Sequence, residues 1–416
     1  MSRPSGEAPA GGWMGRVLRV DLGTHEVSDY PWTDDDRRMW LGGKAMAARI
    51  LADALPDVPA SADHMADGPG HGADPLGPEN VAVISTGPLT GTGAPSSARF
   101  NISALSPLTG LVASSNCGGP FGAHLKKAGY DALVLVGRAA SPVWLEVNEA
   151  GVAFHDAADV WGMRTGEAQT ALAGAVDSRS GVLVIGPAGE HLVPYACVIS
   201  GERAAGRAGM GAVLGSKNVK GLVAWGTRKV PVAHPEKYRA HLKRWTASIK
   251  THPIAGGSLP RLGTAGFLVP MQELGIVATR NFKRGRFEHA AEIDGEALAA
   301  RRLVGTGGCA ACPIHCGRVV ELDGQRIKGP ELETLVLLGA NIENPDLDRI
   351  IEWNALLDEL GLDTMSTGVT LSYAMEAAEK GLWSNGLRFG EVDGLAVVFE
   401  DIAHRRGLGA ELAEGS

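Results

Sequence analysis

The chain has 416 residues, 44% apolar and 21% charged, which is enough for two or three globular domains with a large core. Its formal net charge is −8 and no block of Lys or Arg interrupts the sequence, so nucleic acid is not an expected partner. No run of 18 apolar residues occurs, and the N-terminal MSRPSGEAPAGG lacks the apolar core of a signal peptide. We therefore expect a cytoplasmic protein that does not bind a membrane.

The first half of the chain reads as a β-rich domain over residues 13–230, after a disordered tail at residues 1–12. A hairpin-like opening and a helix over residues 34–55 precede a Pro/Gly/Asp-rich surface loop at 56–78. The strand-like runs that follow are VAVIST, RFNISAL, ALVLVG, VWLEV, VLVIG, YACVIS and GLVAWG. Short strands with few helices between them predict an α+β or mainly β architecture.

A weak internal repeat lies inside this domain. FGAHLKKAGYDALVLVG (121–137) aligns without gaps with MGAVLGSKNVKGLVAWG (210–226). Because Gly, Ala, Leu and Val are common residues, the match can arise by chance. The alternative is a pseudo-twofold domain in which two similar Gly-rich turns each precede a helix and a strand.

Helical patterns dominate after a Pro-rich junction near residues 230–235, so we predict a mostly helical second domain over residues 231–416. The helices are expected at roughly 234–252, 295–304, 345–361, 366–380 and 394–406. The sequence closes on GAELAEGS directly after a helix, which we interpret as a truncated domain. The predicted fold class is therefore α+β, with a β-rich pseudo-twofold N-terminal domain followed by a helical one.

Three cysteines, Cys309, Cys312 and Cys316, stand in GTGGCAACPIHCGR with the spacing C-x2-C-x3-C. Thiolates this close in sequence can hold one metal centre, and the flanking glycines suit a [4Fe–4S] cluster wrapped by backbone. A structural zinc site with His315 as fourth ligand and a set of uncomplexed thiols are the alternatives. Only two more cysteines exist, both far upstream. The pattern predicts an iron–sulfur site without identifying its fourth ligand.

Two stretches combine arginine with glycine. SGERAAGRAGMGAVLGSKN places Arg203 and Arg207 among glycines, and SSARFNISALSPLTGLVASSNCGG places Arg99 upstream of a polar turn at Asn116. A guanidinium binds phosphate through two parallel hydrogen bonds, and glycine lets backbone amides approach an anion. Both stretches are therefore candidate anion sites, although solvated arginines beside Gly-rich turns would look the same.

The segment NPDLDRIIEWNALLDELGLDTMSTG reads as a helix capped by Asn344, with Asp363 just beyond its end. At about 100° per residue, Asp358 falls on the apolar face of this helix. A carboxylate on a buried face needs a partner, either a hydrogen-bond donor or a ligand. A surface position at the end of the helix is the alternative.

GPELETL, shortly after the cysteines, places Glu331 and Glu333 on one side of a short segment that we expect to be extended. Either carboxylate can be an ordinary surface acid.

Together these stretches resemble the tungsten-containing aldehyde ferredoxin oxidoreductase family. The motifs that carry the resemblance are GRVLRVDL, GPLTGTGAPS, SARFN, SPLTG, GYDALVLVG, ERAAGRAGMGAVLGSKN, CAACPIHCGR, GPELE and DELGLDTMSTG. The resemblance implies a β-rich, pseudo-twofold base domain capped by largely helical domains. It also implies two molybdopterins that chelate one tungsten (or molybdenum), a Mg²⁺ between their phosphates, and a nearby [4Fe–4S] cluster.

The same resemblance assigns roles to single residues. Cys309, Cys312 and Cys316 are implied cluster ligands, and Glu333 is the implied catalytic carboxylate beside the metal. The implied pterin or phosphate contacts are Arg99, Asn116, Gly118, Arg203, Ala204, Gly206, Arg207, Asp358, Leu362 and Asp363. The last three belong to the family's D-x-x-G-L-D pterin motif, which reads DELGLD here.

Two departures from the family pattern affect the expected function. The fourth cysteine, a second pterin motif and an active-site histidine belong to a third domain of the family, which we expect this chain to lack. The family's E-x-x-H reads EWNA at residues 352–355, so its subunit-interface iron site does not carry over.

The expected activity is oxidation of an aldehyde to a carboxylate, with electrons passed through the cluster to ferredoxin. A separate chain supplying the third domain and a homodimer are the expected further partners. A catalytically inert, truncated relative that binds cofactor, or acts as a scaffold or electron-transfer subunit, is the alternative.

Overall fold

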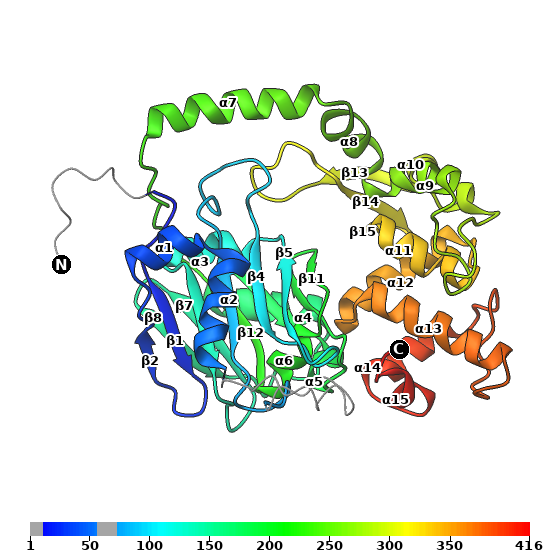
Figure 1. Ribbon diagram of the computed structural model, residues 1–416, viewed down its shortest axis with the longest axis horizontal. Helices are drawn as coiled ribbons and strands as arrows, with labels where there is room; N and C mark the ends of the chain where they lie inside the picture. The colour runs from blue at the N-terminus through cyan, green and yellow to red at the C-terminus, as the bar shows by residue number, and fades with distance from the viewer. Residues whose placement is uncertain (1–10, 56–72) are drawn as a thin grey trace, which may run out of the picture.

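The computed structural model describes residues 11–55 and 73–416, so the predictions for residues 1–10 and 56–72 fall outside it. Two six-stranded sheets form the first half (Figure 1). The first has the order β2-β1-β6-β3-β4-β5 and the second the order β11-β10-β9-β12-β7-β8. The first-sheet strands are β1 (Val17–Asp21), β2 (Val27–Asp29), β3 (Ala82–Thr86), β4 (Phe100–Leu105), β5 (Val112–Cys117) and β6 (Ala132–Val136). Those of the second are β7 (Val143–Asn148), β8 (Gly151–Asp156), β9 (Gly181–Ile185), β10 (Val198–Ser200), β11 (Arg203–Ala205) and β12 (Val219–Ala224).

The two sheets have the same topology. Reading the second sheet from β8 gives β8-β7-β12-β9-β10-β11, which repeats the first sheet strand for strand. In each sheet only the first and last strands in the chain, β1 with β6 and β7 with β12, pair in parallel. The aligned segments become α3 (Phe121–Ala128) before β6 and α6 (Met210–Ser216) before β12. The predicted α+β fold with a pseudo-twofold first half is therefore confirmed, since chance similarity would not reproduce a whole strand order.

Successive side chains along each strand point to opposite faces of the sheet, and this alternation explains how the sheets and helices stack in layers. On β6, Leu133 and Leu135 enter the core shared by both sheets, whereas Ala132 and Val134 pack under α2 (Gly43–Ala54). The shared core also takes apolar side chains from α3 and α6. α4 (Thr165–Val176) packs on the second sheet through Leu172. Each sheet thus buries both faces.

The single helix expected over residues 34–55 is wrong. The chain forms α1 (Asp34–Trp40) and α2, separated at Leu41, whose φ is +57°. Two consecutive glycines, Gly42 and Gly43, follow this residue, and glycine is a poor helix former. A capping box at Thr33 starts α1.

The second half is mostly helical around its own core. It begins with α7 (Pro235–Thr251), which crosses above the sheets as a long, separate helix (Figure 1). The other helices are α8 (Leu259–Leu262), α9 (Leu268–Leu274), α10 (Gly295–Arg301), α11 (Leu332–Leu337), α12 (Leu347–Leu360), α13 (Thr364–Glu379), α14 (Leu395–Ala403) and α15 (Leu408–Leu412); α5 (Pro187–Glu190) belongs to the first half. A small antiparallel sheet joins β13 (Leu303–Gly307), β14 (Gly317–Leu322) and β15 (Gln325–Lys328).

Several local predictions need correction. The helix expected from Asn344 begins at Leu347, because the Asp346 side chain, not that of Asn344, caps it. The segment around Glu331 and Glu333 is not extended: Glu331 is the N-cap residue of α11. The sheet β13-β14-β15 was not expected.

The two halves share part of a core. Tyr195 of the first half is buried among the second-half residues, and its hydroxyl donates to the Leu412 carbonyl at 2.9 Å. Gly12, inside the predicted tail, donates its N–H to Pro231. The domain limits at residues 13 and 230 stay predictions. No helix in the described ranges is long and apolar enough to span a membrane.

Candidate functional site

The three clustered cysteines lie in the loop between β13 and β14 and are partly exposed, free thiols. Their loop contacts the first half of the chain at two points. The Cys312 Sγ lies 3.5 Å from the Ser96 hydroxyl, and a Cβ on Gly118 would come within 2.8 Å of the Cys309 Sγ. Glycine at 118 therefore makes room for the cysteine loop. In the described ranges no three His, Cys, Asp or Glu side chains gather closely enough to hold a single metal ion.

The remaining cysteines do not join this loop. Cys117 ends β5 and Cys197 precedes β10, and both are fully buried. Burial raises the pKa of the Cys117 thiol to about 12 and that of Cys197 well above its ordinary value. Both act as small apolar core residues.

Arg203 stands at the meeting point of three segments. Its Nη1 donates to the Glu331 carboxylate at 3.0 Å, and its side-chain carbons pack beside Gly118 next to the cysteine loop. The second oxygen of Glu331 accepts a hydrogen bond from Thr264 at 2.7 Å. Burial alone would lower the pKa of Arg203, but the negative charges of Glu331 and of thiolates at Cys309 and Cys316 raise it overall. A permanent cation is thus held beside the thiols.

Arg207 connects the Gly-rich turn to the DELGLD motif. Its Nη1 donates to the Asp363 carboxylate at 2.7 Å and to the Ser366 hydroxyl at 3.1 Å. Asp363 is buried and caps α13, accepting the Ser366 backbone N–H. A Cβ on Gly206 would lie 3.6 Å from an Asp363 oxygen, so the backbone here runs close to the motif. The side chain of Arg207 remains about half exposed, at 55%.

Asp358 does find a charged partner, as its place on the apolar helix face requires. Lys328, at the end of β15, donates to it at 2.8 Å. Burial alone would lower the pKa of Lys328, but the carboxylate of Asp358 raises it overall. Further along the motif, Leu362 forms a β-bridge with Ala196. The motif is therefore bonded to the segment that leads into β10 and is not free in solvent.

A pocket of about 620 Å³ opens at the end of the first sheet. Arg99 and Asn116 both line it, and the Arg99 guanidinium donates to the Asn116 side-chain oxygen at 3.0 Å. Lys44 from α2 adds a second cation, and Trp245 reaches the pocket from α7. The walls thus combine cations, amide groups and an indole, which suits a planar anionic ligand.

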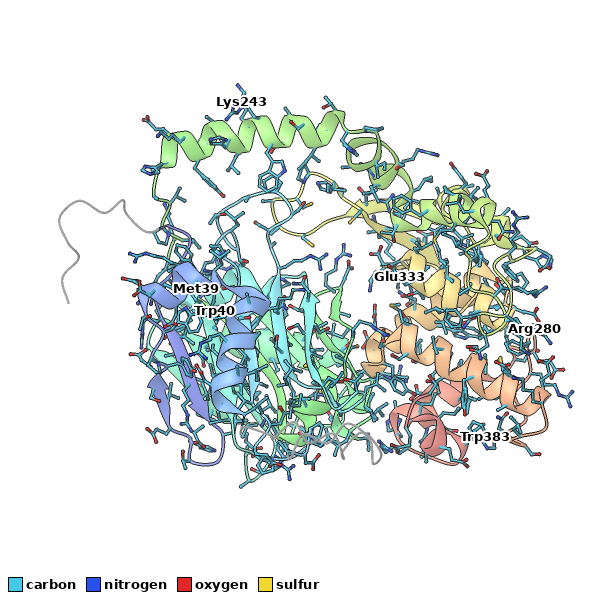
Figure 2. All side chains as sticks on the ribbon, in the orientation of Figure 1. Met39, Trp40, Lys243, Arg280, Glu333 and Trp383 are labelled. Atoms are coloured by element: carbon cyan, nitrogen blue, oxygen red, sulfur yellow. The ribbon has the colours of Figure 1, made fainter. Side chains whose placement is uncertain are left out.

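Glu333 lies in the first turn of α11 and is exposed. Figure 2 shows it on the side of the helical half that faces the sheets. Its carboxylate makes no hydrogen bond or ion pair with any described residue, in contrast to Glu331. It is therefore open to a ligand or to water.

The structure brings the sequence-predicted residues into three neighbouring groups. The first is Arg203, Ala204 and Gly118 with the cysteine loop, the second is Arg207, Gly206, Leu362 and Asp363, and the third is Arg99 and Asn116 at the pocket. Asp358 is turned toward Lys328 instead.

Sequence reasoning missed Ser96, Lys328 and Trp245. Ser96 lies inside the recognised stretches GPLTGTGAPS and SSARFNISALSPLTGLVASSNCGG, and Lys328 directly precedes GPELE, so a position in or beside a motif was the available signal. No pattern in the sequence around Trp245 distinguishes it from an aromatic residue on the surface of an ordinary helix.

Comparison with known proteins identifies related sequences for almost the whole chain. The family model described as "Aldehyde ferredoxin oxidoreductase, N-terminal domain" matches residues 17–226. The model described as "Aldehyde ferredoxin oxidoreductase, domains 2 & 3" matches residues 240–416. Together they take in both sheets, the cysteine loop and the DELGLD motif.

Two curated relatives are named tungsten-containing aldehyde ferredoxin oxidoreductase. The protein from Thermococcus kodakarensis is 42% identical and that from Pyrococcus furiosus is 40% identical, each over 98% of this chain. The chain spans 66% of the length of both relatives.

A solved structure has a similar fold. The active-site complex BamBC of benzoyl coenzyme A reductase, in complex with 1,5-dienoyl-CoA, superposes with a TM-score of 0.83 at 27% identity. The match covers 97% of this chain and 62% of the other.

Proposed function

The chain belongs to the aldehyde ferredoxin oxidoreductase family, and from that premise we propose that it binds the cofactors of an aldehyde-oxidising enzyme. In the proposed reaction an aldehyde and water give a carboxylate, three protons and two electrons. The electrons leave through an iron–sulfur cluster to ferredoxin, because the relatives' name includes ferredoxin. A second copy of the chain and a separate third-domain polypeptide stay predictions.

The convergence at Arg203 is the observation that carries this proposal. An edge strand of the second sheet, a glycine turn after the first sheet and two segments of the helical half meet at one partly buried cation. Thiolates at Cys309 and Cys316 raise the pKa of this cation, and Asn116 of the pocket stands two residues before Gly118. An ion pair that only stabilised the fold would not need thiols and a ligand-sized pocket nearby.

The residues present fit a pterin cofactor that carries tungsten or molybdenum. Arg203 and Arg207 offer guanidinium forks beside Ala204 and Gly206, where small residues let backbone amides approach a phosphate. Arg99 and Asn116 line a pocket whose volume, about 620 Å³, lies in the range of ligand sites. We propose that these residues would hold the pterins and their phosphates, together with Mg²⁺. When bound, the cofactor supplies the two-electron redox chemistry.

DELGLD is the proposed second wall of the pterin site. Asp363 accepts a hydrogen bond from Arg207 and caps α13 with its side chain, and Leu362 forms a β-bridge with Ala196. The backbone of the motif is therefore already ordered. Asp358 is held by Lys328 at 2.8 Å. A preorganised polar wall loses little entropy when it binds a ligand.

The cysteine loop fits an iron–sulfur cluster. Three thiols are a soft donor set, and cluster thiolates each bind a different iron, so they stand further apart than the ligands of one ion. The Ser96 hydroxyl and the Arg203 cation supply a polar donor and a positive charge beside them. We therefore propose Cys309, Cys312 and Cys316 as ligands of a [4Fe–4S] cluster.

Glu333 is the proposed catalytic carboxylate. It is exposed, accepts no hydrogen bond from a described residue, and lies two residues from the Arg203 contact at Glu331. A carboxylate in this state can take a proton from water or from the aldehyde hydrate as the carboxylate product forms.

Metal and pterin analysis of anaerobically purified protein tests the proposal. We expect tungsten or molybdenum, pterin and iron, with roughly four iron atoms per chain only when a fourth cluster ligand is supplied and otherwise a labile or three-iron cluster. Viologen-linked oxidation of a panel of aldehydes measures the activity. Stoichiometric zinc without iron, or iron without any pterin, would contradict the cofactor assignment.

Two variants sharpen this test. Replacing Arg203 and Arg207 together with Ala should abolish pterin content. A control with Arg179→Ala and Arg388→Ala, two exposed arginines on other elements, should keep it. Equal pterin content in both variants would show that the two site arginines do not hold the cofactor.

A further inference from the structure

The helix α7 is unlike every other long helix of the described chain. It runs for 17 residues, and none of its side chains is buried. Figure 1 shows it crossing above the sheets toward the helical half. Its sequence, PEKYRAHLKRWTASIKT, contains five Lys or Arg residues and a single acid, although the whole chain has a net charge of −8. Positive charge is therefore concentrated on one exposed element of an acidic protein.

The apolar side chains of α7 are directed at the molecule. The Tyr238 hydroxyl donates to Thr92 at 2.6 Å, and Trp245 lines the pocket that contains Arg99. Tyr238 also lines an apolar cavity of about 380 Å³ under the start of the helix. Since these residues recur at helical spacing, the opposite face of α7 is left to polar side chains.

Three cations share an outward face of this helix. Arg239, Lys243 and Lys250 stand at positions i, i+4 and i+11, which project from one side of an α-helix. Within the part of the chain that the structure describes, none of the three forms an ion pair with a carboxylate. Figure 2 shows Lys243 pointing away from the rest of the molecule. The charge on this face is thus available to a partner.

The helix α7 lies over the cysteine loop with its inward side. Trp245 of α7 and Ser96 line the same pocket, and the Ser96 hydroxyl is 3.5 Å from the Cys312 Sγ. Beyond α7, the backbone carbonyls of Pro260 and Arg261 accept hydrogen bonds from Arg318, two residues after Cys316. A partner seated on α7 is therefore held close to the thiols.

We propose that the outward face of α7 formed by Arg239, Lys243 and Lys250 docks a small acidic iron–sulfur protein that accepts electrons from the cysteine-loop cluster. The inference rests on the proposed function, which supplies the cluster. Each encounter oxidises the reduced cluster by one electron and reduces one acceptor, so two acceptors are consumed per aldehyde. An acidic acceptor is repelled by the net negative chain and attracted by α7, which orients the encounter.

A membrane surface fits this face less well. Basic helices that bind anionic lipid bury an apolar face in the bilayer, whereas the apolar residues of α7 already face the protein. The outward side carries the three cations with small residues and one acid, Glu236. A soluble acidic partner matches that chemistry.

The test uses the full chain loaded with cofactors and a triple variant, Arg239→Gln with Lys243→Gln and Lys250→Gln. The control variant, Arg301→Gln with Arg388→Gln and Arg406→Gln, removes the same number of exposed positive charges from other elements. Turnover is measured with a purified ferredoxin of negative net charge and, separately, with a viologen dye. Binding to immobilised ferredoxin is measured at low and high ionic strength without substrate.

We expect the α7 variant to lose on the order of tenfold in kcat/KM for ferredoxin at low ionic strength. Its viologen-linked rate should equal that of the wild type, and high salt should remove the difference, because screening weakens exposed charges. Equal ferredoxin binding and turnover in the wild type and both variants would overturn the docking face. The docking face would also be overturned if the wild type bound phosphatidylserine vesicles while the α7 variant kept the wild-type rate of ferredoxin reduction.

The two proposals fail separately. Absence of viologen-linked oxidation in the wild type counts against the proposed function. The substrate-free binding measurement still decides the docking face in that case.

Discussion

The Arg203 guanidinium and the Glu331 carboxylate form a 3.0 Å ion pair across 128 residues of sequence. Arg203 is part of an edge strand in the first half, and Glu331 begins a helix in the second. Their side chains are 23% and 29% exposed. The pair therefore joins the two halves at the point where the cysteine loop meets the Gly-rich turn.

A double-mutant cycle with Arg203→Gln and Glu331→Gln should reveal coupling in the free energy of unfolding. We expect each single substitution to destabilise the protein by about 1–3 kcal/mol, because it leaves a partly buried group unpaired. The double variant should lose less than the sum of the two. Urea unfolding measures all four proteins, and strictly additive losses would show that the pair contributes no mutual stabilisation.

Gly118→Ala should impair iron binding. Its new Cβ would lie 2.8 Å from the Cys309 Sγ and 3.2 Å from the Arg203 Cγ, so the cysteine loop must move. Gly174→Ala is the matched control, because a Cβ there meets nothing within 4 Å. We expect the iron content to fall in the first variant and to stay at the wild-type value in the second. Normal iron in Gly118→Ala would mean that the loop moves without cost to the cluster.

Ser96→Ala should make the midpoint potential of the proposed cluster more negative. A hydrogen bond to a thiolate ligand stabilises the reduced, more negative cluster. If that bond contributes about 1 kcal/mol, the shift is roughly 40 mV for a one-electron couple. Redox titration followed by electron paramagnetic resonance measures it.

Ser97→Ala is the control for the Ser96 prediction. Its hydroxyl donates to the Leu89 and Ala94 carbonyls inside the same loop and to no sulfur. Equal shifts in the two variants would assign the effect to the loop conformation and not to the Ser96 hydroxyl.

Lys217 should make stability rise with pH in the alkaline range. Burial lowers the pKa of its ammonium from 10.5 to about 8, and its Nζ donates to the Gly137 carbonyl at 3.0 Å. Between about pH 8 and pH 10.5 the unfolded chain binds more protons at this site than the folded chain, so deprotonation favours folding. Below pH 8 the cost of burying the charge is fully present.

Comparison with Lys217→Met isolates this effect. The free energy of unfolding of the wild type, relative to the variant, should increase by about 1–3 kcal/mol between pH 8 and pH 10. Urea unfolding at a series of pH values measures the difference. A constant difference across that range would contradict the depressed pKa.

Local sequence was sufficient for the strands, for most helices and for the chemistry of the motifs. The runs ALVLVG and GLVAWG alternate or concentrate apolar residues strongly enough to predict β6 and β12, and the C-x2-C-x3-C spacing alone suggests a metal centre. The repeat of 121–137 at 210–226 also lay in the sequence, but only the matching strand orders decided that it reflects a pseudo-twofold fold. The errors concern helix ends, where neighbouring residues compete to start or stop a helix. At Leu41 a positive φ ends α1, and at Asp346 the side chain caps α12 in place of Asn344.

Local patterns in the sequence therefore specified the helices and strands, the family motifs and the kinds of side chain that each motif supplies. The tertiary structure decided which of those side chains meet: Arg203 with Glu331, Asp358 with Lys328, Ser96 with Cys312. It also decided that α7 stands exposed with its cations outward. Secondary structure follows from interactions over a few residues, whereas these pairings depend on how two sheets and a helical half pack, which no local pattern encodes.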